Sequence, residues 1–459
     1  MSLLESTHRL NALQQRMQGS VIQPGGDDWE AATQAFNLAF VQEPALVALP
    51  ANEQDVRTLV AFAHENGMQL APQRTGHNAE PLGAMDNVIL VKTDALQGVE
   101  IDVERRIARV GSGVKWESVV PRASELGLAA LHGSTPDVSV TGYSLGGGVG
   151  WYARKLGLST NSVVAIELVT ADGELRRVDL ENDPELFWAL RGGGGNFGIV
   201  TTIEVQLYPI AEVYAGVLFF PWERSAEVLK AWHAWTKTVP DEVTSVGRIL
   251  QFPPIPEIPE PLRGNNFVVV EAVMLVGERE GKDLLKPLRE LDAAIDTFAM
   301  LPPVGISELH MDPPTPLPYT GEGQMLGEID DEIIDSFVTA AGPGSGSRLV
   351  SAEIRHVGGA LGRSQPHHGA LDTFDADYLT FGVGMVFDEE SYSSHRAALA
   401  AIRWAFYPAD NGRQYLNFTE EKSDPATFYK PDNYRRLREI KRAFDPTDIF
   451  RANHPIAPA

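Results

Sequence analysis

The hydrophobic pattern along the chain predicts a mixture of strands and helices. Short apolar runs with strand character occupy residues 45–49, 88–91 and 108–110. Residues 55–66 instead carry apolar side chains close to helical spacing. Residues 1–28 are also helical in pattern, as far as the turn cluster 24–28 that precedes Trp29. This alternation indicates an α+β or α/β architecture.

A hairpin is predicted between residues 163 and 179. Two β-rich runs are joined there by Ala171-Asp172-Gly173, and an Asp-Gly pair supplies the positive φ of a tight turn. The next segments are predicted as a helix over 183–190, a glycine-rich break over 191–198 and a strand over 199–209. Pro184 suits the first turn of that helix.

A second domain is predicted after Pro209, where the composition changes. Strand-like runs with two or three intervening helices predict an antiparallel sheet with helices on one face. The clearest of these runs cover residues 267–277, 349–359 and 379–387. The final segment contains an amphipathic helix over 433–444, which Asp445-Pro446 ends. We therefore expect units over 1–210 and 211–410 and a closing segment over 411–459.

Charge and composition narrow the classes of function. The 459 residues include 62 acidic and 38 basic side chains, a net charge of −24, and no cysteine. Disulfides, thiolate metal sites and cysteinyl cofactor bonds are therefore excluded. The acidic surplus disfavours nucleic acid and membrane surfaces as partners. Because neither a membrane span nor a secretory signal is evident, we expect a cytoplasmic protein. We also expect a monomer or homodimer with a small molecule as its partner.

The densest chemical motif covers residues 131–161. Its glycines stand at 133, 142, 146, 147, 148 and 150. Consecutive glycines let the backbone approach a ligand and point several N–H groups at one place, as in a pyrophosphate nest. The alternative is a flexible surface loop, but the glycines lie between apolar residues rather than serines and charges. The spacing matches neither a Rossmann fingerprint nor a P-loop, so a dinucleotide would require a different fold.

A second motif, QRTGHN, covers residues 73–78. A lone histidine in a glycine turn is more often a hydrogen-bonding loop residue than a catalytic one. Together with GSTPDVSVTGYSLGGGVG at 133–150 and DPELFWALRGGGGNFGIVTTIEVQLYP at 183–209, however, the motif resembles the vanillyl-alcohol oxidase / p-cresol methylhydroxylase superfamily. The likeness is to its berberine-bridge-enzyme-like flavoproteins. The closing runs 414–418 and 433–456 are similar to the same family.

The resemblance implies a PCMH-type FAD-binding domain of two subdomains, completed by the C-terminal segment, with the antiparallel sheet covering the isoalloxazine. The family's loop histidine corresponds to His77, which would form an 8α-N-histidyl bond to FAD. The remaining FAD contacts implied by the motifs are Arg74, Thr75, Gly76, Asn78, Thr135, Pro136, Val138, Thr141, Gly142, Leu145, Gly146, Gly147, Gly148, Gly150, Gly198, Val200, Tyr415 and Asn417.

Departures from the family pattern sharpen this expectation. Thr135 stands where many members have a cysteine bonded to flavin C6, so a bicovalent flavin is excluded and His77 is left as the one covalent anchor. This makes a carbohydrate oxidase less favoured without excluding it. Gln73 and Thr75 replace common arginine and glycine residues. Val138 occupies the family's oxygen-gating position and favours an oxidase, although it could equally be a packing residue.

The family reaction moves hydride from a C–H next to a hydroxyl or amine to flavin N5, while a base takes the heteroatom proton and O2 accepts the electrons. Tyr429, Tyr415 and Asn417 match residues that line this site. A tyrosine base needs a nearby cation to lower its pKa of about 10, and Arg355 could provide one. We expect an oxidase of a small alcohol or amine. The alternatives are a dehydrogenase, a carbohydrate or natural-product tailoring oxidase, and a non-enzymatic flavin carrier.

The run 351–356 also carries candidate chemistry. If it is a strand, Ser351, Glu353 and Arg355 share one face, which could supply the base or contact the substrate. The alternative is a solvent-exposed, salt-bridged strand. His367 and His368 are adjacent and lack a third ligand at suitable spacing, so we expect no metal site there.

Overall fold

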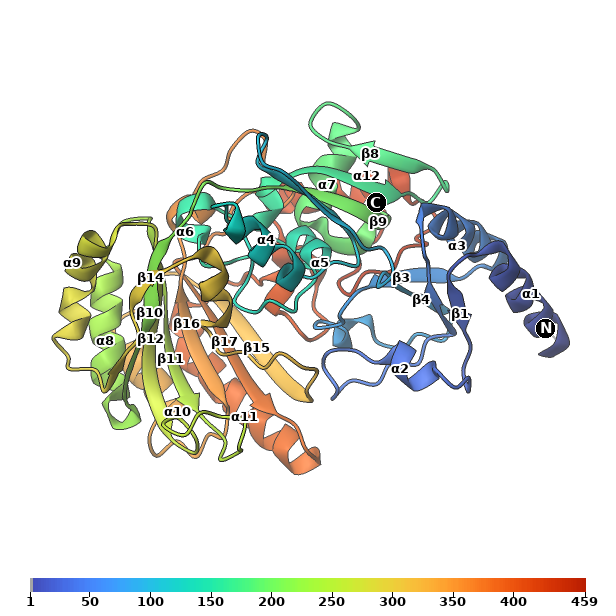
Figure 1. Cartoon of the computed structure of the whole chain (residues 1–459). Helices are drawn as coiled ribbons and strands as arrows, with labels where there is room; N and C mark the ends of the chain where they lie inside the picture. Colours follow the sequence, from blue (N-terminus) through green and yellow to red (C-terminus); the bar gives the residue numbers. More distant parts are fainter. Residues whose placement is uncertain (1–2) are drawn as a thin grey trace.

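The computed structural model describes residues 3–459, in which three sheets are arranged as shown in Figure 1. The N-terminal sheet has the order β1 (Ser20–Ile22), β2 (Leu46–Leu49), β4 (Val88–Lys92) and β3 (Gln69–Gln73). Strands β2, β4 and β3 are parallel, and α3 (Glu53–Asn66) connects β2 to β3. The remaining N-terminal helices are α1 (Leu3–Arg16) and α2 (Trp29–Thr33).

The second sheet is antiparallel. Its order is β5 (Val99–Asp102), β6 (Ile107–Gly111), β9 (Ile199–Gln206), β7 (Val163–Val169) and β8 (Leu175–Val178). Strands β7 and β8 form the predicted hairpin, in which Gly173 has the positive φ of 77°. The helices of this region are α4 (Val120–Glu125), α5 (Val140–Leu145), α6 (Ala153–Leu156) and α7 (Pro184–Gly193). Helix α7 runs into the glycine segment where a break was predicted, although Arg191 and Gly192 leave helical geometry.

The third and largest sheet is also antiparallel. Its main path is β13 (Ile295–Asp296), β10 (Val213–Pro221), β12 (Asn266–Met274), β11 (Val243–Gln251), β16 (Ser351–His356), β17 (Tyr378–Met385) and β15 (Tyr319–Leu326), and β14 (Ala299–Leu301) pairs with β10. One face packs under α8 (Ser225–Thr236), α9 (Glu278–Arg289), α10 (Asp331–Ala341) and α11 (Glu389–Phe406). This confirms the predicted α+β class, with an antiparallel sheet covered by helices on one face.

The other face of the large sheet packs against the middle of the chain. Trp151 and Tyr152 share a buried apolar cluster with alternate residues of β10 and β12, such as Val217 and Val269. In Figure 1 the teal helix α6, which begins at Ala153 directly after these residues, lies at the upper end of the large sheet. The face that the helices leave free is therefore directed at the glycine-rich motif.

The C-terminal segment returns to the first two sheets. Helix α12 (Pro431–Phe444) contacts α7, and the amide of Leu70 in β3 donates to the carbonyl of Ile449 at 2.8 Å. The predicted helix over 433–444 is thus confirmed. The predicted N-terminal helical segment is partly wrong because β1 lies within it, and its first two residues lie outside the described residues. None of the helices among residues 3–459 has both the length and the hydropathy needed to cross a bilayer.

Candidate active site

The loop after β3 offers a run of unpaired backbone donors. Within the described part of the chain, the amide N–H groups of residues 74–78 have no hydrogen-bond acceptor. Gly76 has φ of 77°, and a Cβ there would come within 3.0 Å of Ala35. Successive free amides around a left-handed residue form a concavity suited to an anion such as a diphosphate.

His77 lies in this loop with one ring face and both ring nitrogens in contact with neighbouring side chains. The ring stacks on Phe36 with centroids 3.8 Å apart, and Nδ1 lies 2.8 Å from the Thr75 hydroxyl. Nε2 faces Asp137 Oδ2 at 3.7 Å. The Tyr319 hydroxyl donates to the His77 carbonyl at 3.0 Å. The imidazole is therefore held in one orientation, with its two nitrogens in different surroundings.

The neighbours of His77 attach the loop to other parts of the chain. Asn78 Nδ2 donates to the carbonyls of Leu416 and Thr419 at 3.1 and 3.0 Å. Arg74, expected at the cofactor, has its guanidinium bonded to Asp94 at 2.7 Å and to the Gly113 carbonyl at 2.6 Å. Nε and Nη1 of Arg74 are thus committed to protein contacts.

The glycine run at 146–150 packs against the side chain of Tyr415 instead of lining an open space. The amides of Gly148 and Val149 donate to the Tyr415 hydroxyl at 2.9 and 3.0 Å, and Asn417 Nδ2 donates to the same oxygen at 3.1 Å. A Cβ at Gly146 would lie 1.9 Å from Asn417 Oδ1. The expectation that these amides cradle pyrophosphate is therefore wrong for residues 148 and 149, because a phenol oxygen occupies them.

A buried cluster of charges lies on the free face of the large sheet. Glu353 Oε1 accepts from Arg355 Nε at 2.6 Å, and Glu353 Oε2 lies 2.9 Å from His310 Nε2. His310 Nδ1 lies 2.5 Å from Glu271, which also pairs with Arg248 at 3.0 Å. Glu353 and Glu271 are 2% and 0% exposed, so the alternative of a solvent-exposed strand is wrong. The shared face of Glu353 and Arg355 was predicted correctly.

Electrostatics fix the charge states in this cluster. Burial and the positive charge of Arg248 oppose protonation of His310, but Glu271, Asp312 and Glu353 together raise its pKa to about 9. Burial opposes ionisation of Glu353, yet Arg355 and His310 hold its pKa far below the usual value. Near neutral pH the cluster therefore contains a charged imidazole beside ionised carboxylates.

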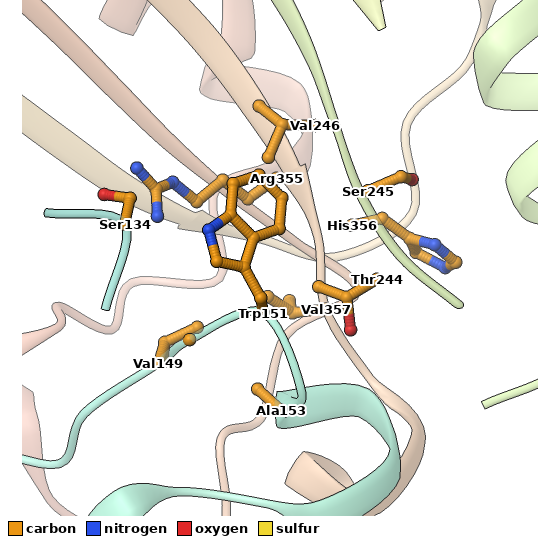
Figure 2. Close-up of a pocket in the computed structure, with 11 residues that line it drawn as sticks. Ser134, Val149, Trp151, Ala153, Thr244, Ser245, Val246, Arg355, His356 and Val357 are labelled. Carbon is orange, nitrogen blue, oxygen red and sulfur yellow. The ribbon is translucent and has the colours of Figure 1, made fainter. Parts of the chain in front are cut away.

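A small cavity of about 10 Å³ lies beside this cluster. It is lined by Ser134, Val149, Gly150, Trp151, Ala153, Thr244, Ser245, Val246, Arg355, His356 and Val357. Figure 2 shows the Arg355 guanidinium turned toward Ser134 and the Trp151 indole, with the His356 ring directed the other way. The cavity thus joins the glycine motif to the charged strand β16.

Two protein-family models match the chain. A model described as an FAD binding domain covers residues 44–179, which include the His77 loop and the glycine run. A model described as "Berberine and berberine like" covers residues 414–457, which include Tyr415 and Asn417. The chain therefore carries an FAD-binding domain and a berberine-like C-terminal domain, and it is an FAD-linked oxidoreductase.

Relatives of this oxidoreductase span nearly its whole length. The (R)-6-hydroxynicotine oxidase of Paenarthrobacter nicotinovorans is 28% identical and aligns over 96% of this chain and 97% of its own. A solved structure of 6-hydroxy-D-nicotine oxidase from Arthrobacter nicotinovorans superposes with a TM-score of 0.83 at 25% identity, over 96% and 98% of the two chains. A glucooligosaccharide oxidase from Acremonium strictum, described with 6-S-cysteinyl, 8α-N1-histidyl FAD, gives 0.82 at 21% identity over 98% and 99%.

FAD is the cofactor of this oxidoreductase, and the described residues fit it. The five unpaired amides at 74–78 match the acceptor-rich diphosphate. Buried polar atoms that have no partner among the described residues lie in the same motifs, including Asn78 Oδ1, Thr141 Oγ1 and Trp151 Nε1. An unpaired buried polar atom is costly, so a bound polar ligand explains their presence.

Other residues expected at FAD make protein contacts. The Thr135 hydroxyl donates to Asp137 Oδ1 at 2.5 Å, and the Pro136 and Val138 carbonyls accept from Glu117 and Trp116. Elsewhere, Gly142 N contacts the Ser139 hydroxyl, Leu145 and Val200 lie in the core, and a Cβ at Gly198 would meet Leu168 at 2.7 Å. A Cβ at Gly147 or Gly150 would come within 2.9 Å of Leu371 Cδ2 or 2.0 Å of the His132 carbonyl oxygen. Packing alone therefore accounts for glycine at positions 147, 150 and 198.

The expected pairing of Tyr429 with Arg355 is wrong. The Tyr429 hydroxyl donates to the Gly192 carbonyl at 2.9 Å, and its ring stacks on Tyr434. Burial, followed by the negative charge that Tyr434 would carry, raises the pKa of Tyr429. Arg355 instead lies over the ring of Phe418, at 5.0 Å. Tyr429 is therefore placed as a packing residue of the FAD-binding region.

Sequence reasoning missed His310, Glu271 and Arg248. Glu271 and Arg248 are single charges within the apolar runs of β12 and β11, and such an isolated charge in a buried strand is a detectable sign of an ion pair. His310 lies in a loop and carries no such pattern. It reaches the cluster because that loop passes over the free face of the sheet.

We expect the His310 cluster to make stability depend on pH. Because the pKa of His310 is about 9 in the folded chain and 6.5 for an ordinary histidine, the folded chain keeps a proton between these values that the unfolded chain loses. The stabilisation is complete below about pH 6.5 and is lost as pH rises through 9. Thermal unfolding midpoints should therefore fall over this window.

His310→Gln should weaken that fall. Burial raises the pKa of Glu420 to about 8, which acts in the same direction, so the difference between wild type and variant isolates the imidazole. Identical pH dependence in both proteins would contradict the assignment.

Proposed function

We propose that the chain is an oxidase that removes hydride from a C–H bond next to a hydroxyl or amine of a small molecule and passes the electrons to O2. The observation that carries this proposal is Glu353, a buried and ionised carboxylate beside the cavity residue Arg355. Its Oε2 lies 2.9 Å from Nε2 of the charged His310, which lowers the pKa of Glu353 and keeps the carboxylate ionised. An ionised carboxylate can accept the substrate proton when this contact with His310 is released.

In this mechanism Glu353 takes the proton from the substrate hydroxyl or amine. The guanidinium of Arg355 and the imidazolium of His310 orient the Glu353 carboxylate. Their positive charges balance its negative charge before the proton arrives. Trp151 is buried and contributes an apolar wall to the cavity. The bound flavin supplies the hydride acceptor and the reaction with O2.

The proposed cofactor anchor is His77, and Thr135 leaves no cysteine for a second bond. The histidyl linkage named for the glucooligosaccharide oxidase supports a histidine anchor in this fold. The hydroxynicotine oxidase relative supports an amine substrate, and the oligosaccharide oxidase supports an alcohol. Amines and alcohols are therefore the two substrate classes to compare first.

Anaerobic titration tests the reaction class. Amines and alcohols, including hydroxylated pyridine amines and oligosaccharides, are added without O2 while the oxidised flavin absorbance is followed, and air is then admitted. Bleaching with rapid recovery and H2O2 release supports an oxidase. Bleaching that persists in air indicates a dehydrogenase, and no bleaching with any compound indicates a flavin carrier.

His77→Ala should abolish covalent flavin while leaving the fold intact. Its ring contacts Phe36 and Asp137 but is partly exposed, so its removal leaves no large buried cavity. Denatured wild-type protein should keep its flavin fluorescence on a gel, and the variant should lose it. Release of all flavin from the wild type by acid would refute the anchor.

A further inference from the structure

Asp137 faces the proposed anchor from the neighbouring loop. Its side chain is 3% exposed, and Oδ2 lies 3.7 Å from His77 Nε2 with no hydrogen-bond partner in the described chain. Burial opposes its ionisation, but contacts with His77 and Thr135 and the charge of Lys115 lower its pKa. A buried carboxylate with one unused oxygen therefore points at one nitrogen of the histidine.

Thr135 fixes the direction of this carboxylate. Its hydroxyl donates to Asp137 Oδ1 at 2.5 Å, which leaves Oδ2 for His77. The residue that stands in place of a second cysteine anchor thus serves the remaining anchor.

The two ring nitrogens have complementary partners. A carboxylate can only accept, so Asp137 favours the tautomer with a proton on Nε2. The lone pair is then on Nδ1, next to the Thr75 hydroxyl, which can donate to it at 2.8 Å. Stacking on Phe36 prevents the ring from turning over. The nucleophilic nitrogen is thereby selected before any bond forms.

We propose that Asp137 is a positioning residue for covalent attachment of FAD, setting the tautomer of His77 and accepting its Nε2 proton as the bond forms. This role rests on the proposed function, in which His77 anchors FAD. It gives Asp137 a part in cofactor maturation, distinct from the role of Glu353 in turnover.

The attachment balances with O2 as the oxidant. A bond forms between Nδ1 and the flavin 8α carbon, and one C–H bond of that methyl group breaks. The methyl proton is released to solvent, and the Nε2 proton passes to Asp137. The electron pair from the C–H bond reduces O2 to H2O2, which takes up two protons. The imidazole ends neutral and alkylated.

Asp137→Asn tests this role. The amide keeps the size of the side chain but can present its NH2 to Nε2, which favours the wrong tautomer. We expect attachment to slow by about 100-fold, followed as gel fluorescence of denatured samples during aerobic incubation with FAD, while non-covalent FAD still binds. Wild-type attachment kinetics in this variant would overturn the proposal.

Two further variants keep the test decisive. Thr135→Val removes the hydroxyl that holds Oδ1 of Asp137, so covalent attachment should slow, though less than in Asp137→Asn. If Asp137→Asn fails to bind FAD, the Thr135→Val variant decides the test. An unchanged attachment rate in Thr135→Val would then overturn the proposal. Asp172→Asn is the matched control, because this carboxylate also accepts from a threonine hydroxyl two residues earlier, at 2.6 Å, but pairs with Arg176 rather than with His77. Its attachment rate should equal that of the wild type, and an equal loss there would overturn a specific role for Asp137.

The failures of the two proposals are distinguishable. If peptide mass analysis of the wild type finds no flavin on His77, the proposed anchor falls. If the wild type carries flavin on His77 and Asp137→Asn attaches it at the same rate, only the inference about Asp137 falls.

Discussion

Glu353→Gln should slow flavin reduction by substrate by about 10²- to 10⁴-fold, because glutamine fits the same space but cannot accept the substrate proton. The reductive step is measured anaerobically in a stopped-flow instrument as loss of the oxidised flavin absorbance. FAD content and covalent attachment should stay at the wild-type level, because Glu353 belongs to the sheet rather than to the His77 loop.

Glu322→Gln provides the matched control for this variant. Glu322 is a carboxylate of β15 in the same sheet, but its partners are Arg396 and Arg403 rather than His310. Its reduction rate should stay at the wild-type level, because Glu322 contacts none of the charged groups around Glu353. A normal rate in Glu353→Gln would remove Glu353 from the mechanism.

Lys441→Met should destabilise the fold by about 3–5 kcal/mol, because it leaves the Asp445 carboxylate buried without its cation. Both side chains are fully buried, with Nζ 2.6 Å from Asp445 Oδ2. Nζ also donates to the carbonyls of Asn196 and Phe450. The change is measured as the free energy of unfolding in urea, followed by circular dichroism.

The double variant Lys441→Met/Asp445→Asn separates the lost ion pair from lost packing. Removing the second charge should restore part of the stability, because the penalty comes chiefly from the unpaired carboxylate. A loss below about 1 kcal/mol in the single variant would contradict the assignment of this pair as a structural clamp.

Local pattern was sufficient to predict much of the fold. The runs at 45–49, 88–91 and 108–110 became β2, β4 and β6 because apolar β-rich segments leave few alternatives in a buried sheet. The hairpin at Gly173 followed from its turn chemistry. Strand β1 was missed because its three residues are too short for any periodicity.

The site was only partly predictable, because its chemistry arises between distant segments. The alternation of β16 placed Glu353 and Arg355 on one face, which the structure confirms. His310 joins them from a loop, and Tyr415 meets the amides of Gly148 and Val149 across more than 260 residues of sequence. Hydrophobic periodicity reports which side of an element is buried, but not which loop will face it. Tyr429 lies in a motif that suggested a catalytic role, but its ring packs against Tyr434.

The C-terminal segment packs against the first strands, so the His77 loop cannot make all of its contacts until the last residues have been synthesised. The β3 edge is bonded to Ile449, and the loop after β3 is tied through Asn78 to Leu416 and Thr419. A nascent chain that has left the ribosome only as far as residue 400 holds His77 but none of these partners. We therefore expect the His77 loop to take its final form, and to load cofactor, only after the C-terminal segment has been synthesised.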